Sequence, residues 1–200
     1  LGKVRPEYAA MLNMPGETVV IAGGSDTQLA VKSTQPEVED IVIVSGTTTP
    51  VIRITNAYLL DGRQRTWTNR HVETDKFILE TNAGVTGLNY QQLKAIFYPH
   101  ESYEIIEEEL AAIDYPACTA SRGSLVADEA TALTKGGFVF HAPVSRQLTR
   151  ADFVWAILWD IACSIKLNYD SLCDVVPYKP DYIWGCGGGF QSRPLSRFVA

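Results

Sequence analysis

The sequence predicts an α/β domain in which helices cover a mixed β-sheet. Three short runs rich in β-branched and aromatic residues indicate strands, at residues 19–21, 41–44 and 182–184. The apolar residues of segment 150–169 recur with helical spacing and predict a long helix with one broad buried face. Strands, a hairpin, helices and a returning strand in this order are typical of a sheet with helices packed against it.

The other elements are predicted from local signals. Asp61-Gly62 indicates a hairpin between segment 51–60 and a following strand. Pro99 ends a helix, and Thr149 with Asp152 three residues later forms a variant of the capping box in front of the long helix. The remaining predicted segments are helices over 6–14, 87–98 and 103–113, a short helix or turn over 27–32, a strand over 72–79, and a loop over 114–136.

Composition and charge exclude several classes of function. The 200 residues suit one domain or one lobe of a larger protein. A net charge of −6 argues against a nucleic-acid binder, which normally shows a basic patch. No apolar run approaches the ~18–20 residues of a membrane span. The four cysteines form no CxxC pair, which predicts reduced thiols in a cytoplasmic protein.

Several conspicuous residues are better explained by structure than by chemistry. The three histidines are scattered, Trp155 and Trp159 are spaced to pack on one helix face, and segment 107–109 is a run of glutamates typical of a solvated helix surface. The histidines are His71, His100 and His141. No metal ligands are predicted. The chain starts at Leu1 and ends in a helical pattern over 195–200, so we expect truncation at both ends, including the C-terminal end of the fold.

Each of the three strands runs into a loop that contains glycine. The first leads into Gly23-Gly24-Ser25-Asp26, the second into Ser45-Gly46-Thr47-Thr48, and the third into Gly185-Cys186 followed by three glycines at 187–189. Glycine lets the backbone turn sharply and approach a ligand closely. We therefore expect one ligand cleft, with Asp26 placed to receive a proton from a substrate hydroxyl.

These patterns also have plainer explanations. Asp26 could be a helix N-cap or turn residue, because aspartate after glycines commonly is. The threonines at 47–49 could cap a turn at the end of a strand. Three glycines in a row could form a flexible loop, although a strand before them and a helical pattern after them favour a nucleotide-binding loop.

The order of these motifs resembles the C-terminal domain of the FGGY carbohydrate kinases, which phosphorylate sugars and polyols. The resemblance rests on the segment 19–26, Ser45-Gly46-Thr47, the pair Gly84 and Gly87, and the glycines at 187–189, and it covers nearly all of the chain. The stretch from Arg70 to Leu93 looks most like the autoinducer-2 kinase branch. The resemblance implies a ribonuclease-H-like, actin-like ATPase fold.

The resemblance also implies roles for individual residues. Asp26 stands where the family has its catalytic base. The positions beside the nucleotide phosphates are Gly46, Thr47 and Thr48, and Gly87 opens a helix that lines the nucleotide site. The late run that contacts adenosine in the family corresponds to Gly187, Gly188, Gly189 and Ser192.

Three departures from the family pattern stand out. The long helix of the family usually carries Arg-Ala and then Glu-Gly one turn later, where this chain has Trp155-Ala156 and Trp159-Asp160. The aromatic-Leu-Pro segment with a following Gly-Glu-Arg is not recognisable in 114–140. The half with the first phosphate loop and the magnesium aspartate is absent.

The resemblance therefore predicts that residues 1–200 are the C-terminal lobe of a two-lobed kinase whose N-terminal lobe is not in this chain. Its expected activity is ATP- and Mg²⁺-dependent phosphorylation of a sugar or polyol hydroxyl, with Asp26 as general base. The isolated lobe is expected to be inactive. The sequence leaves open whether the protein forms a homodimer. The alternative is a non-catalytic sugar- or nucleotide-binding module of the same fold.

Overall fold

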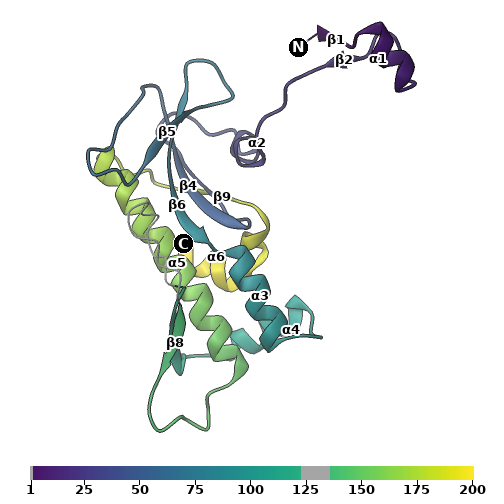
Figure 1. The fold of residues 1–200 in the computed structure, drawn as a ribbon. Coiled ribbons are helices and arrows are strands. Elements are labelled where there is room, and N and C mark those ends of the chain that lie inside the picture. The colour runs from purple at the N-terminus through teal and green to yellow at the C-terminus, as the bar shows by residue number, and fades with distance from the viewer. Residues whose placement is uncertain (1, 123–135) are drawn as a thin grey trace.

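Figure 1 shows the computed structural model of the chain, which describes residues 2–122 and 136–200. Its elements, in chain order, are β1 (Gly2–Lys3), α1 (Pro6–Met11), β2 (Val19–Val20), α2 (Asp26–Ser33), β3 (Ile41–Val44), β4 (Thr48–Thr55), β5 (Trp67–Arg70), β6 (Phe77–Val85), α3 (Gly87–Phe97), α4 (Tyr103–Ala111), β7 (Cys118–Ser121), β8 (Gly137–Phe140), α5 (Arg150–Val175), β9 (Trp184–Cys186), the 3₁₀ helix η1 (Gly188–Gln191) and α6 (Arg193–Val199).

The main sheet has five strands in the order β5-β6-β4-β3-β9. The pairs β5–β6, β6–β4 and β4–β3 are antiparallel, whereas β3 and β9 are parallel. The sheet is therefore mixed, as predicted. Because β3 and β9 run in the same direction, the loops that follow them emerge at the same edge of the sheet.

The two faces of the sheet bury different residues. Ile41 and Ile43 belong to the larger core cluster, which also contains the apolar face of α5. Val42 and Val44 belong to a second cluster with Val31 of α2. This alternation follows from the two-residue period of a strand, and it shows that β3 is covered on both faces. In Figure 1 the long helix α5 runs along one side of the sheet.

The long helix starts where the sequence predicts and extends further. Thr149 and Asp152 form the predicted capping box, in which Asp152 Oδ2 accepts from the Thr149 N–H at 2.8 Å. The helix continues to Val175 and ends just before Pro177, which cannot continue it. The Trp155 and Trp159 rings stack on one face of α5, as predicted, with 5.5 Å between the ring centres.

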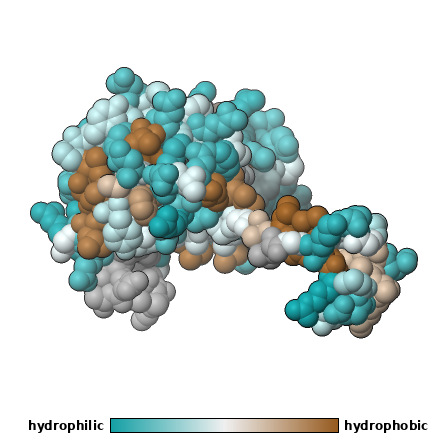
Figure 2. Space-filling view, turned by 90° about the horizontal axis from the view of Figure 1, so that it is seen from above, coloured by the Kyte–Doolittle hydropathy of each residue, from teal (hydrophilic) through white to brown (hydrophobic). Residues whose placement is uncertain are grey.

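Several strand predictions are wrong in whole or in part. The predicted strands over 72–79 and 182–184 begin later in the structure, as β6 (Phe77–Val85) and β9 (Trp184–Cys186). Residues 19–21 do not form a buried strand of the main sheet, because only Val19–Val20 is extended and it pairs with β1 in a separate two-stranded sheet. Ile21 is 79% exposed. Figures 1 and 2 show this N-terminal segment projecting from the main body of the molecule.

The predicted hairpin at Asp61-Gly62 is also wrong. Strand β5 pairs with β6, and β6 lies between β5 and β4. Asp61 instead organises the long connection between β4 and β5, where its carboxylate accepts from the backbone N–H groups of Arg63 and Arg65 at 3.1 and 2.9 Å. Part of the predicted loop over 114–136 is strand β7, which pairs with β8, and residues 123–135 of it lie outside the described residues.

Candidate functional site

Three backbone segments meet at the edge of the sheet where β3 and β9 end. They are the loop after β3, the first turn of α3 and the η1 segment after β9, and they form one wall of a cavity of about 710 Å³. Helix α4 and the start of α6 form the opposite wall. The lining residues are Ser45, Gly46, Thr47, Gly87, Leu88, Tyr90, Gln91, Tyr103, Glu104, Glu107, Glu108, Gly188, Gly189, Gln191, Ser192 and Arg193.

The loops after β3 and β9 are hydrogen-bonded to each other through Ser45. Its N–H donates to the Cys186 carbonyl at 2.8 Å, and its carbonyl accepts from the Gly189 N–H at 3.0 Å. Gly187 has φ +93°, and a Cβ there would lie 2.9 Å from the Ser45 carbonyl carbon. Glycine at 187 is therefore required both by its backbone conformation and by this contact.

The first turn of α3 is held against the same loop. The Thr86 and Leu88 N–H groups donate to the Thr47 carbonyl at 3.1 and 3.3 Å. A Cβ at Gly87 would lie 3.0 Å from the Gly46 carbonyl carbon and closer still to its oxygen. Only glycine at 87 allows α3 to begin this close to the β3 loop, so Gly87 and Gly187 are explained by close backbone approach.

Acidic and aromatic side chains of α3 and α4 also line the cavity. The Tyr90 and Tyr103 rings lie 6.2 Å apart, and Lys94 stands 5.3 Å from the Tyr103 ring centre. Glu107 accepts from the Arg193 N–H at 3.2 Å. Burial, together with the negative charge of Glu107, raises the pKa of Tyr90 well above its ordinary value, so this phenol stays neutral.

The cavity gathers most of the residues predicted for nucleotide binding. Gly46, Thr47, Gly87, Gly188, Gly189 and Ser192 line it. Ser192 also caps α6, where its Oγ accepts from the Leu195 N–H at 3.5 Å. Gly187 and Thr48 adjoin these residues in the chain without lining the cavity, and the Thr48 carbonyl accepts from the Gly46 N–H at 3.0 Å.

Asp26 does not join this cluster. It is exposed and is the first residue of α2, where its Oδ1 accepts from the Thr27 N–H at 2.8 Å. The N-cap is Ser25, whose Oγ accepts from the Gln28 N–H at 3.3 Å. The prediction that three strand ends form one cleft is therefore wrong for the segment 19–21. Only the ends of β3 and β9 meet at this cavity.

The sequence did not reveal the residues of the opposite wall. Segment 107–109 was predicted to be solvated, yet Glu107 faces the cavity, and Glu109 accepts from the Tyr98 hydroxyl at 2.6 Å and pairs with Arg150. The apolar spacing of α4 identifies its buried face, Ile106 and Leu110. It carries no signal for which polar residues face another element.

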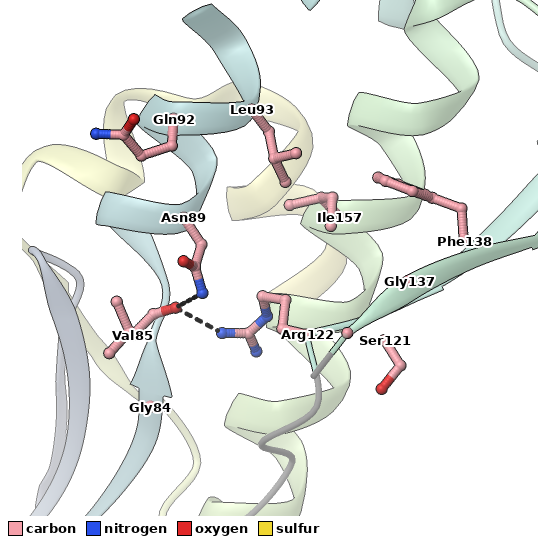
Figure 3. A pocket seen from close by; sticks show the side chains of 11 residues that line it. Gly84, Val85, Asn89, Gln92, Leu93, Ser121, Arg122, Gly137, Phe138 and Ile157 are labelled. Atoms are coloured by element: carbon pink, nitrogen blue, oxygen red, sulfur yellow. Dashed lines mark hydrogen bonds between the residues drawn. The ribbon is translucent and has the colours of Figure 1, made fainter. Parts of the chain in front are cut away.

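A second cavity, of about 620 Å³, lies on the other side of α3 (Figure 3). It holds none of the predicted site residues. Figure 3 shows Asn89 of α3 and Arg122 donating to the same Val85 carbonyl, at 2.7 and 3.3 Å. Arg122 also pairs with Asp160 of α5 at 2.7 Å, and both side chains are nearly fully buried.

Neither a metal site nor a membrane span is seen in the part of the chain that the structure describes. Within residues 2–122 and 136–200, no three acidic, histidine or cysteine side chains are grouped as a metal ion would require. No helix in these ranges has both the length and the apolar character of a membrane-spanning segment.

Comparison with known proteins bears on this site. No family model matches the chain. It is 52% identical over 202 residues to the Bacillus subtilis (strain 168) protein named "Putative sugar kinase YoaC", a match that covers all of this chain and 41% of that protein. The chain therefore spans less than half the length of this curated relative.

Solved structures show the same fold. A xylulose kinase from Rhodospirillum rubrum matches with a TM-score of 0.77 and 18% identity, over 100% of this chain and 41% of that one. A Plasmodium falciparum glycerol kinase with ADP matches with a TM-score of 0.77 and 15% identity, over 99% and 40%. The chain has the fold of a sugar-kinase lobe. The predicted actin-like ATPase fold of the FGGY kinase C-terminal domain is confirmed.

Packing accounts for the departure in the long helix. Trp155 and Trp159 both contact the Phe198 ring of α6, at 4.9 and 5.2 Å between centres. Asp160 pairs with Arg122. None of these residues lines the cavity at Ser45, so the altered helix motif leaves that wall intact.

Proposed function

We propose that this chain is the C-terminal, nucleotide-binding lobe of a two-lobed kinase that transfers a phosphoryl group from ATP to a sugar or polyol hydroxyl. The single observation that carries the proposal is the glycine wall at Ser45. A Cβ at Gly87 or Gly189 would collide with the neighbouring loop, so side-chain-free backbone lines a cavity of about 710 Å³. Loops of this kind let phosphates approach backbone N–H groups closely.

The names of the relatives support the proposal of a sugar or polyol kinase. A Bacillus subtilis relative that is 52% identical to this chain is named "Putative sugar kinase YoaC", and one solved neighbour is a glycerol kinase with ADP. In this chain, we assign nucleotide binding to Gly46, Thr47, Thr48, Gly87, Gly188, Gly189 and Ser192, with Gly187 shaping the loop. The aromatic and amide side chains that line the cavity from α3, α4 and η1 would contact the base.

The proposed phosphoryl transfer depends on positioning and charge neutralisation. Mg²⁺ supplies the charge that offsets the phosphates, and it usually binds through phosphate oxygens with one or two carboxylates. Because the family that the chain resembles has its magnesium aspartate in the other half, we assign the protein ligands of Mg²⁺ to the other lobe. Asp26, exposed at the start of α2, accepts the proton of the acceptor hydroxyl.

A sugar panel tests this function in the full-length protein. ADP release would be followed with ATP, Mg²⁺ and individual pentoses, hexitols and glycerol, and at least one of them should stimulate turnover. Residues 1–200 alone should release no ADP above background. ATP binding without sugar-dependent turnover on any compound would instead support a binding module, and turnover by the isolated segment would refute the two-lobe assignment.

A further inference from the structure

The turn between β5 and β6, residues 71–76, lies against helix α2. Gln28 of α2 donates through Nε2 to the carbonyl of Arg70 at 3.0 Å, directly before the turn. One helical turn later, Lys32 forms an ion pair with Glu73 inside the turn. Helix α2 is thus attached at two points to one short segment that is more than forty residues away in sequence.

The same turn also supports the backbone that precedes Asp26. A Cβ built at Gly24 would lie 3.5 Å from Val72 Cγ1 and 3.3 Å from Leu29 Cδ2. The chain therefore passes close to the turn two residues before Asp26. Among the described residues, exposed Asp26 accepts a hydrogen bond only from the Thr27 N–H. Its position therefore depends on the positions of α2 and of the backbone before it.

The conformation of the turn depends on His71. The His71 N–H donates to the Lys76 carbonyl at 3.1 Å, which closes the turn. Its Nδ1 accepts from the Glu73 N–H at 3.0 Å. An imidazole that accepts at Nδ1 carries its proton on Nε2 and is neutral. Burial lowers the pKa of His71, against the opposing charge of Glu73, and favours this neutral form.

The burial of His71 has a cost that its packing alone does not explain. The residue is 7% exposed, and its Nε2 has no hydrogen-bond partner among the described residues. A buried donor without a partner is unfavourable, and an apolar side chain would avoid that cost. The polar contribution of His71 is its Nδ1 acceptor, which fixes the turn.

We propose that His71 is a positioning residue for Asp26: its neutral imidazole locks the 71–76 turn, and the turn holds α2 and the backbone before it. This inference rests on the proposed function only for the role of Asp26 as the base. Sugar phosphorylation needs the base placed within hydrogen-bond reach of the hydroxyl, so loosening α2 should slow turnover without changing the nucleotide cavity.

The test compares three variants of the full-length protein with wild type. His71→Ala removes the Nδ1 acceptor, His71→Asn keeps an acceptor for the Glu73 N–H in its Oδ1, and His100→Ala changes an exposed histidine elsewhere as the matched control. The readouts are amide hydrogen exchange of residues 24–33 and of α5, and the kcat and KM values for sugar and ATP.

His71→Ala should raise exchange in residues 24–33 about tenfold while α5 stays protected, and should lower kcat about tenfold or more at unchanged KM for ATP. His71→Asn should keep most of the wild-type exchange protection and most of the wild-type kcat. His100→Ala should match wild type in both. If His71→Ala does not fold, Gln28→Ala tests the same attachment from α2 and should move both readouts in the same direction, by less.

Unchanged exchange in residues 24–33 would overturn the inference whatever the activity. Raised exchange with unchanged kcat in an active enzyme would overturn the link to Asp26. Failure of the proposed function looks different, because wild type itself would then show no sugar-dependent turnover. In that case the role of His71 for the base falls with it, while exchange still reports whether His71 holds α2.

Discussion

The Gly189 N–H donates to the Ser45 carbonyl at 3.0 Å, which joins the loop after β9 to the loop after β3. These strands are parallel neighbours in the sheet. In open α/β sheets, ligands bind in the crevice outside the carboxyl ends of such strands. The Ser45–Gly189 contact therefore places the glycine-lined cavity where this architecture favours a ligand.

Substitutions at two adjacent glycines should separate binding from stability. A Cβ at Gly189 would lie 2.8 Å from Ser45 Cβ, whereas a Cβ at Gly188 meets nothing within 4 Å. Gly189→Ala should lower the melting temperature of the full-length protein, since overpacking typically costs about 1–3 kcal/mol. Gly188→Val should leave the melting temperature nearly unchanged and raise the KM for ATP about tenfold, or ~1.4 kcal/mol. A lower melting temperature with an unchanged KM for ATP in Gly188→Val would place the nucleotide elsewhere.

Asp26→Asn should affect turnover alone. The substitution removes the proposed proton acceptor but keeps an oxygen for the Thr27 N–H, and the residue is exposed. Losing a positioned base typically lowers the rate on the order of 10²–10⁴-fold. Steady-state kinetics should show that loss in kcat, with an unchanged KM for ATP and an unchanged melting temperature. A variant with more than about half of the wild-type kcat would exclude Asp26 from proton transfer.

Asp61 should contribute to stability above its unfolded pKa and lose that contribution in acid. Burial raises its pKa, but hydrogen bonds from the Arg65 side chain and from the Arg65 and Arg63 N–H groups outweigh burial and lower the pKa from 3.8 to about 2. The unfolded state then binds more protons between these values, so stability rises with pH across this window.

The corresponding measurement is urea unfolding of wild type and Asp61→Asn at a series of pH values. The variant should be less stable at pH 7 by on the order of 1–2 kcal/mol. The difference should shrink as the pH falls from 3.8 towards 2. A difference that does not depend on pH would show that the Asp61 charge contributes nothing.

The ion pair between Arg122 and Asp160 should be costly to break from one side. Both side chains are at most 4% exposed, so Asp160→Ala leaves a buried guanidinium without its counter-charge. Such a loss typically costs about 3–5 kcal/mol. The double variant Arg122→Met/Asp160→Ala should be more stable than Asp160→Ala in thermal melts. A single variant as stable as wild type would mean that the pair is not formed.

Elements with strong local signals could be predicted from the sequence. The run 41–44 is apolar at every position because β3 is covered on both faces. The capping box at Thr149 and the periodic apolar face behind it are local properties of α5. The family resemblance pointed to Gly87, and the strand-to-glycine pattern pointed to the run 187–189, in which Gly187 and Gly189 approach Ser45 closely.

Features set by long-range pairing could not be predicted. The Asp61-Gly62 signal describes a local turn, but strand partners are chosen across the sheet, and β6 pairs with both β4 and β5. Val19–Val20 is β-branched yet finds its partner in β1. Glu107 faces the cavity only because α4 and α6 pack together there. No spacing within one element encodes such an arrangement.

The most direct test of the central claim is calorimetric titration of ADP with Mg²⁺ into three forms of the full-length protein. These are wild type, Gly188→Val in the glycine-lined cavity, and Gln92→Ala in the cavity of Figure 3 on the other side of α3. Wild type and Gln92→Ala should bind ADP equally well, and Gly188→Val should bind about tenfold more weakly. Equal affinity in Gly188→Val and wild type, or loss of binding in Gln92→Ala, would contradict the assignment of the nucleotide to the wall formed by Ser45, Gly87 and Gly189.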